Sequence, residues 1–398
     1  MAKCSLLEGF KIIDVTNVIA GPTVSWFLQD MGADVIKVEH PVRGDDARYF
    51  PPIRNGTSGA FVSLNRGKRG LAVDLNTPEG VEIVRELAKD ADAFVENFTP
   101  GTMKRWGLDY ETLSKINPGI VMVSVSGFGQ TGPMNQLPGY DIVAQAMSGI
   151  MSVTGQPGGP PTRAGVLIGD SSAGAFGCIG LLAALLNKQK TGLGQHVDVS
   201  MQDVLICYYD VPSYTWGGKL LGRTGNRLPN IAPFDNYLTK DDRWVIIAAA
   251  NNNLWAQLCG IMGRPELAND PRFDSNSNRS SNYDALNEAI NQWTTQHTLN
   301  EIVELLRAKG LPVAPILNID EVLALPHVVH RQVCVELDDP LAGKVKVQGS
   351  PIKFSRTPCV AEKSAPRIGE NTREILTELG YPEERINQLA KNGIIKVV

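Results

Sequence analysis

Residues 10–40 read FKIIDVTNVIAGPTVSWFLQDMGADVIKVEH and contain two strand-like ends around a helix-like centre. The ends, FKIIDVT and DVIKVEH, are short apolar runs rich in β-branched residues, as in buried strands. The central GPTVSWFLQDMG predicts a helix. A helix between two strands favours a parallel pair, because parallel strands need a crossover connection. The stretch therefore predicts an α/β fold.

The same alternation continues along the first third of the chain. Further strands are predicted at LAVDL (71–75), AFVEN (93–97) and GIVMVSVS (119–126), with an amphipathic helix at 77–91. This order is typical of a doubly wound parallel sheet. Glycines and prolines in GGKLLGRTGNRLPNIAPFD (217–235) interrupt the pattern. A second unit is expected to begin there, either inserted into the first domain or appended to it.

Charge, apolar runs and cysteines exclude several classes of partner. The 398 residues carry a net charge of −4, which argues against a general nucleic-acid binder. The strongest apolar run, around residues 178–186, is too short to span a bilayer, and the N-terminus lacks the apolar core of a signal peptide. Six scattered cysteines without a C-x-x-C pair predict mostly buried free thiols and no metal site. The missing signal peptide and membrane span predict a cytoplasmic protein.

A dinucleotide-binding pattern, G-x-G-x-x-G, occurs in SGFGQTGP (126–133). The strand before it fits a nucleotide-binding loop, but a helix should follow directly so that its N-terminus meets the phosphates. Here Pro133 and the polar MNQLPGYD follow instead. The sequence favours a structural turn over a nicotinamide or flavin site.

The stretch VLIGDSSAGAFGCIGLLAALLNKQKTG (166–192) carries the strongest candidate for chemistry, Asp170. A strand-like GVLIG leads into a helix that is apolar nearly all round and is expected to be buried. Asp170 could cap this helix, with Ser171 and Ser172 as further capping candidates. Alternatively, Gly169 and Gly174 would leave room for a ligand, and the helix dipole would favour an ionised nucleophile.

Basic residues gather between positions 43 and 70, where the balance is +4 in an acidic chain. They are Arg43, Arg48, Arg54, Arg66, Lys68 and Arg69, opposed by Asp45 and Asp46. The cluster could be a solvated face or a site for phosphates. The histidines show neither a catalytic triad nor metal spacing, and no Walker loop occurs.

Several motifs in order along the chain resemble the class III CoA-transferases, such as formyl-CoA transferase and carnitine CoA-transferase. The motifs are IIDVTNVIAGP (12–22), GADVIKVEHPVRGDDAR (32–48), NRGKRGLAVDL (65–75), VENFTPGTMKRWG (95–107), SGFGQTGP with GYD (126–141), GDSSAG (169–174) and TGLGQHVDVSMQD (191–203). RPELANDPRF and PRIGENTREILTELGY extend the resemblance towards the C-terminus.

This resemblance implies a Rossmann-like large domain built from both chain ends, with a smaller α+β domain between. The expected domains are 1–220 and 330–398 for the large one, and 225–325 for the small one. It also implies an interlocked homodimer that takes CoA and acyl-CoA as substrates with a small carboxylic acid, and no tightly bound cofactor.

The resemblance also implies the roles of individual residues. Asp170 matches the nucleophile, which forms an anhydride and then an aspartyl-CoA thioester. The residues that match CoA contacts are Asn17, Val18, Ile19, Ala20, His40, Val73, Asp74, Leu75, Asn76, Asn97, Phe98, Arg105, Gly139 and Tyr140.

The chain departs from the formyl-CoA transferases at three places. Ile19 stands where they have Gln, His40 where they have Arg, and AAANNNLW (248–255) where they have a glycine-rich loop. These differences favour another acid pair, with acetyl-CoA or succinyl-CoA as donor and a dicarboxylate or hydroxy acid as acceptor. Two alternatives stay open. One is an acyl-CoA racemase, although Tyr140 replaces its histidine base; the other is a non-catalytic CoA-binding protein.

Overall fold

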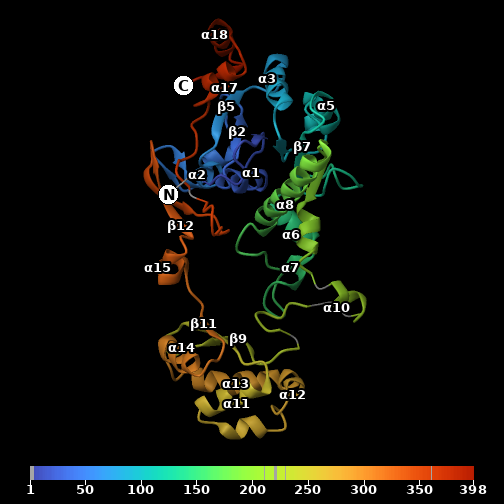
Figure 1. Ribbon diagram of the computed structural model, residues 1–398. Helices are drawn as coiled ribbons and strands as arrows, with labels where there is room; N and C mark the ends of the chain where they lie inside the picture. Colours follow the sequence, from blue (N-terminus) through green and yellow to red (C-terminus); the bar gives the residue numbers. More distant parts are fainter. Residues whose placement is uncertain (1–3, 210, 219–221, 229, 360) are drawn as a thin grey trace. The chain divides into compact units, whose positions relative to one another are not determined.

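The computed structural model describes residues 4–209, 211–218, 222–228, 230–359 and 361–398, and the chain divides into two compact units (Figure 1). Unit 1 comprises Met1–Ile150, Arg163–Val211 and Pro326–Val398, so it takes residues from both chain ends. Unit 2 comprises Met151–Thr162 and Pro212–Leu325. Relative to the expected domains, residues 151–162 and 212–220 fall into the smaller unit.

A seven-stranded sheet forms the centre of unit 1. Its order is β14-β5-β2-β1-β6-β7-β8, and all neighbours are parallel except β14, which is antiparallel to β5. The strands are β1 (Lys11–Asp14), β2 (Asp34–Glu39), β5 (Arg69–Val73), β6 (Ala93–Glu96), β7 (Val121–Ser126), β8 (His196–Ser200) and β14 (Ile395–Lys396). The chain order of the six parallel strands is 3-2-1-4-5-6, which reverses between β1 and β6. The predicted parallel sheet is confirmed, with β8 and β14 added.

Two layers of helices cover this sheet, because successive strand residues face opposite sides. Ile12 belongs to one apolar core and Ile13 to the other. The first core includes α1 (Ala20–Asp30), α8 (Ile168–Thr191) and α9 (Met201–Ile206), with α6 (Asp141–Met147) beside them. The second includes α3 (Pro78–Lys89), α4 (Thr102–Trp106), α5 (Tyr110–Ile116), α17 (Thr372–Glu378) and α18 (Glu383–Lys391).

A smaller group of elements lies beside the α2 helix of unit 1. Val62 of α2 packs on the antiparallel pair β12–β13 through Leu337 and Val347. The elements are η1 (Asp46–Tyr49), β3 (Ile53–Arg54), β4 (Thr57–Ser58), α2 (Gly59–Asn65), β12 (Cys334–Asp339) and β13 (Gly343–Gln348). Unit 1 also contains α7 (Ile150–Val153) in part and α16 (Pro326–His330).

Unit 2 has its own antiparallel sheet and helical layer. The sheet order is β11-β10-β9, and the core contains Trp255, Ile290 and Leu306. The strands are β9 (Phe234–Leu238), β10 (Trp244–Ala248) and β11 (Val313–Pro315). The helices are α10 (Val211–Thr215), which starts at the boundary, α11 (Asn252–Ile261), η2 (Pro265–Asn269), α12 (Asn276–Ser281), α13 (Tyr283–Thr294), α14 (Leu299–Ala308) and α15 (Ile319–Ala324).

The helix α8 differs from its prediction in two ways. GVLIG forms no strand, since α8 begins at Ile168 and the residues before it are irregular. The helix is buried on one side only: Phe176, Ile179 and Leu186 are 39%, 61% and 62% exposed. The expectation that α8 is buried on all sides is therefore wrong within a single chain.

By length and composition, α8 is the one helix among the described residues that could cross a membrane, but core helices of other proteins also meet this test.

All six cysteines are free thiols. Cys4, Cys178 and Cys259 are buried, Cys207 is exposed, and Cys334 and Cys359 are half-buried. The predicted burial therefore holds for three of the six.

A glycine in α8 allows the helix to pack closely on α1. A Cβ at Gly174 would lie 2.5 Å from the Thr23 Cβ and 2.8 Å from the Ala20 carbonyl oxygen. The space next to Gly174 is therefore filled by α1, and the expectation that this glycine leaves room for a ligand is wrong. A Cβ at Gly169 would likewise lie 3.0 Å from Asp141 Oδ1.

We expect Gly174→Ala to destabilise unit 1 by about 1–3 kcal/mol, because the new methyl group has no space. Gly260→Ala in α11 is the matched control: a Cβ there meets no atom within 4 Å. Alanine at that helical position is expected to be neutral or to stabilise by up to about 1 kcal/mol. Chemical denaturation of both variants checks this, and equal stability of Gly174→Ala and wild type would contradict the packing argument.

Candidate active site

The topological reversal of the sheet places two asparagines together. Asn17 follows β1 and Asn97 follows β6, and ligands of doubly wound folds bind at such a reversal, beyond the carboxyl ends of the strands. The Asn17 backbone N–H donates to Asn97 Oδ1 at 2.7 Å, and Asn97 Nδ2 donates to the Asn17 carbonyl at 2.8 Å. This reciprocal pair fixes the loop after β1 to the loop after β6.

Two adjoining cavities open at this edge of the sheet. One, of about 270 Å³, contains Asp170, and the other has about 230 Å³. Both are lined by Asn17, Asp46 and Phe98, so they meet at the reversal point. A long substrate could therefore occupy both cavities with its reactive end at Asp170.

The structure brings most of the predicted site residues to these cavities. The Asp170 cavity is lined by Asn17, Val18, Ile19, Ala20, Asn97, Phe98, Gly139 and Tyr140. The second cavity is lined by Asn17, His40, Val73, Leu75, Asn76 and Phe98. Two predicted residues line neither cavity. Asp74 lies 4.0 Å from His40 Nε2, whereas the Arg105 guanidinium donates to Thr102 Oγ1 at 3.4 Å.

Asp141 caps the helix that carries Asp170. Its Oδ1 accepts the backbone N–H of Gly169 at 2.7 Å and that of Asp170 at 3.3 Å, and its Oδ2 accepts from Gln145 Nε2 at 2.6 Å. The N-cap position itself is Leu167, so the hypothesis that Asp170, Ser171 or Ser172 caps α8 is wrong. Within the described residues no group donates a hydrogen bond to the Asp170 carboxylate, which leaves it available to a ligand.

The electrostatics of Asp170 also differ from expectation. Burial, reinforced by the nearby Asp141 carboxylate, raises the pKa of Asp170 to about 7. The helix dipole was expected to favour the ionised form. Desolvation and the like charge outweigh it, because they act directly on the carboxylate. A carboxyl group with such a pKa in a cavity is a candidate for chemistry.

The glycine pattern of residues 127–132 positions Tyr140. A Cβ at Gly127 would lie 2.7 Å from the Gly139 Cα, so the two backbones touch where only glycines fit. No helix follows the pattern directly, since the next one, α6, begins at Asp141. The preference for a structural turn over a dinucleotide loop agrees with this geometry. The contact brings Gly139 and Tyr140 to the end of β7.

Most of the basic cluster between residues 43 and 70 lines neither of the two cavities. Its members pair with carboxylates elsewhere in unit 1: Arg48 with Glu39, Arg66 with Asp30, Lys68 with Asp14, and Arg69 with Asp34, while Arg54 donates to the Lys344 carbonyl. Arg43 is exposed and lines the second cavity. Of the basic cluster, only Arg43 therefore remains a candidate for binding phosphate at these two cavities.

His40 lies beside Arg43 in the second cavity. Its Nδ1 accepts the backbone N–H groups of Val42 and Arg43 at 3.1 and 3.2 Å, which fixes the ring. The sequence prediction of the site omitted Arg43, Asp46 and Asp141. Each had a sequence clue, because Arg43 belongs to the basic cluster, Asp46 lies in the motif at 32–48, and Asp141 lies in the GYD motif next to Tyr140.

Comparison with known proteins identifies the family. A family model described as CoA-transferase family III matches residues 7–372. The chain belongs to this family.

Other CoA-transferases resemble the chain along almost its whole length. It is 37% identical to the succinyl-CoA–D-citramalate CoA-transferase of Chloroflexus aurantiacus, over 98% of each chain. It is 38% identical to the succinyl-CoA:glutarate CoA-transferase of Mus musculus, over 98% of this chain and 90% of the other. The crystal structure of a CAIB/BAIF family protein from Brucella suis superimposes with a TM-score of 0.86 at 36% identity, covering 95% of this chain and 100% of that one. This protein is a CoA-transferase that moves CoA between an acyl-CoA and a free acid.

The raised pKa of Asp170 predicts how the stability of this CoA-transferase depends on pH. Below the usual aspartate range the carboxyl is protonated in both the folded and unfolded states, so wild type and Asp170→Asn should be similar. As pH rises to about 7, only the unfolded state ionises fully, and wild type should lose up to roughly 4 kcal/mol relative to the variant. Above that pH the difference should stay constant. Denaturation at a series of pH values measures it.

The Asp141→Asn variant is the matched control for this prediction. Asparagine keeps an oxygen for the Gly169 and Asp170 amides but removes the like charge. We expect the stability gained by Asp170→Asn at neutral pH to be smaller in the Asp141→Asn background. A difference that does not change with pH in either background would contradict a raised pKa for Asp170.

Proposed function

We propose that this enzyme transfers CoA from an acetyl-CoA- or succinyl-CoA-like donor to a small dicarboxylic or hydroxy acid through covalent intermediates on Asp170. The observation that carries the proposal is the Asp170 carboxylate. It lies in a cavity at the carboxyl edge of the sheet and receives no hydrogen bond from the described residues, since Asp141 performs the capping role. The names of the compared relatives, which give succinyl-CoA with D-citramalate or glutarate, support this choice of acids.

The first half of the reaction consumes the donor. An Asp170 oxygen attacks the thioester carbonyl carbon, the C–S bond breaks, and CoA leaves as a thiolate. The thiolate then attacks the aspartyl carbonyl of the mixed anhydride, which releases the donor acid as a carboxylate and leaves an aspartyl-CoA thioester. The acceptor carboxylate attacks this thioester, and the same two steps run in reverse. Water must be excluded throughout, because hydrolysis would destroy the thioester or the anhydride.

We assign the second cavity to the nucleotide end of CoA. His40 and Arg43 supply a fixed ring and an exposed guanidinium, which suits phosphate oxygens. Val73, Leu75 and Asn76 line the same cavity, and Asn17 and Phe98 lie between the two cavities. The proposal includes no tightly bound cofactor, because CoA enters and leaves as a substrate.

Covalent trapping tests the role of Asp170. Protein incubated with succinyl-CoA or acetyl-CoA, then treated with hydroxylamine or borohydride, is expected to carry a modification on Asp170 by peptide mass spectrometry. The Asp170→Ala variant should remain unmodified and lose at least about 10³-fold in kcat, because the nucleophile is gone. Asp141→Asn is the matched carboxylate control, and its Asp170 should still be modified.

A modification on Asp141, or none with several donors, would contradict the proposed intermediates. Deuterium exchange at the carbon next to the thioester carbonyl without CoA transfer would favour the proton transfer of a racemase. Loss of trapping in Asp141→Asn as well as in Asp170→Ala would show that the Asp141 carboxylate itself takes part.

We further propose that the working form is an interlocked homodimer in the cytoplasm. The exposed apolar side chains of α8, among them Phe176, Ile179 and Leu186, support a second chain that covers them. The six free thiols suit a reducing compartment.

Subunit exchange distinguishes an interlocked dimer from an ordinary one. Two separately purified versions with different affinity tags, mixed after folding, should form no mixed dimers over days, because linked chains cannot separate without unfolding. Denaturing and refolding the mixture should give mixed dimers. Sequential affinity capture measures both. Exchange without denaturant, or a monomer in light scattering, would rule out the interlocked form.

A further inference from the structure

The loop between β1 and α1, residues 15–19, has an unfavourable backbone at its centre. Val18 has a φ of +67°, a left-handed conformation that β-branched residues rarely adopt. Such a conformation persists only where the surrounding structure holds it, and it is found mainly at functional sites. Val18 and Ile19 line the Asp170 cavity, and Asn17 lines both cavities. The shape of this β1–α1 loop therefore helps to define the site.

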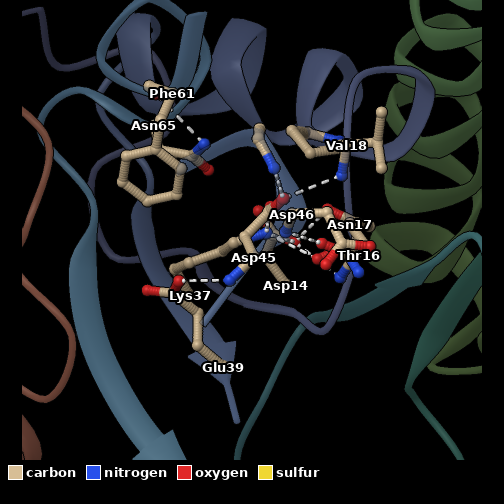
Figure 2. A network of polar contacts seen from close by, with 12 residues as sticks. Asp14, Thr16, Asn17, Val18, Lys37, Glu39, Asp45, Asp46, Phe61 and Asn65 are labelled. Carbon is tan, nitrogen blue, oxygen red and sulfur yellow. Dashed lines mark hydrogen bonds and ion pairs between the residues drawn. The ribbon is translucent and has the colours of Figure 1, made fainter. Parts of the chain in front are cut away.

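A buried carboxylate holds the strained residue. Asp45 Oδ1 accepts the backbone N–H of Val18 at 3.0 Å and that of Ala47 at 2.8 Å (Figure 2). Its side chain is only 1% exposed, although Asp45 belongs to the wall of the second cavity. The Asp45 carboxylate thus connects the loop after β1 to the segment after β2.

A buried lysine fixes the other side of the loop. Lys37 Nζ donates to the Thr16 carbonyl at 2.5 Å and lies 2.9 Å from Asp45 Oδ2. The same nitrogen lies 3.7 Å from Asp14 Oδ1, and Asp14 accepts the backbone N–H of Thr16 at 2.9 Å. Lys37 has no exposed side-chain surface and lines neither cavity. Figure 2 shows Lys37 with the groups it contacts, among them Thr16 and Asp45, and any effect of Lys37 on the reaction passes through these groups.

We infer that Lys37 and Asp45 are positioning residues for CoA transfer, which hold the β1–α1 loop, with Val18 left-handed, in the shape that presents the thioester to Asp170. The inference rests on the proposed function of Asp170. It assigns a task in the reaction to a buried ion pair that would otherwise be only structural. A buried ion pair is weak evidence for stability by itself, because desolvation offsets the attraction.

Substitution of Asp45 separates the hydrogen bond from the charge. Asp45→Ala removes the acceptor of the Val18 N–H, and we expect kcat to fall at least about tenfold as the reacting groups lose their alignment. Asp45→Asn keeps an amide oxygen for Val18 and Ala47, and kcat should stay within about threefold of wild type. The KM for the acyl-CoA should change less than kcat in Asp45→Ala. If Asp45 acted only on stability, kcat would not be restored when asparagine rather than alanine replaces it.

The Asp30–Arg66 pair provides a matched control. It is also buried, with an Arg66 Nη2 to Asp30 Oδ2 distance of 2.7 Å, and it lines neither cavity. Asp30→Ala should lower the melting temperature but leave kcat and KM within about twofold, since this pair holds no part of the loop. An equal loss of kcat in folded Asp30→Ala and Asp45→Ala would overturn the inference, as would unchanged kinetics in Asp45→Ala.

A double-mutant cycle with Val18→Gly tests the role of strain. Glycine adopts positive φ without steric penalty, so the loop should depend less on Asp45. The fold loss of kcat caused by Asp45→Ala should therefore be at most about a third as large when residue 18 is glycine as when it is valine. Equal losses in both backgrounds would show that Asp45 does not act by holding Val18.

Trapping on Asp170 distinguishes failure of this inference from failure of the proposed function. Wild type that transfers CoA without a modified Asp170 would refute the aspartyl intermediate. The kinetic comparison of Asp45→Ala, Asp45→Asn and Asp30→Ala would still decide whether the loop is positioned. Suppose instead that Asp170 is modified in wild type and is modified at the same rate in Asp45→Ala. That result would refute the positioning role alone.

Discussion

The structure of the site depends on one buried carboxylate, Asp14, at the end of the first strand. Burial by itself would raise the pKa of Asp14, but Lys37 and Lys68 lower it below its usual range. Lys68 Nζ donates to Asp14 Oδ2 at 2.8 Å and also contacts Ser25 of α1. Two lysines and the carboxylates of Asp14 and Asp45 thus compensate one another where water cannot reach. The cluster joins β1, β2, α1 and the turn before β5 at a single point.

The geometry of the candidate site follows from this cluster and from the order of the strands. Reversal of the sheet between β1 and β6 leaves a crevice, and Asn17 and Asn97 join its two sides. The buried charges set the backbone of the β1–α1 loop, whereas Asp141 takes over the capping of α8. The Asp170 carboxylate therefore receives no hydrogen bond from the described residues. The polar groups that shape the site are mostly buried and paired, and the groups left exposed, such as Arg43, face the cavities.

The fold was predicted well because its signals are local. Apolar runs of the right length marked β1, β2, β5, β6 and β7, and the helix between β5 and β6 had a clear cap at Thr77. The strand proposed at residues 165–169 failed because a short apolar run can equally begin a helix. The basic cluster was wrongly considered as a phosphate site for a different reason. Its partners, including Asp14, Asp30, Asp34 and Glu378, lie outside that window, and Glu378 is more than 300 residues away from Arg69. Counting charges within a window cannot reveal such pairs.

The sequence by itself determined the α/β class, the parallel sheet, the family resemblance and Asp170 as the residue to examine. These depend on residue order and on periodicity over a few turns or strands, which a single chain displays directly. Only the tertiary structure decided that Asp141 caps α8 and that burial raises the pKa of Asp170 to about 7. It also decided that Asp45, which is paired with Lys37, accepts the backbone N–H of Val18. Hydrogen bonds, desolvation and Coulomb interactions act over a few ångströms in space, and folding sets those distances between residues far apart in the chain.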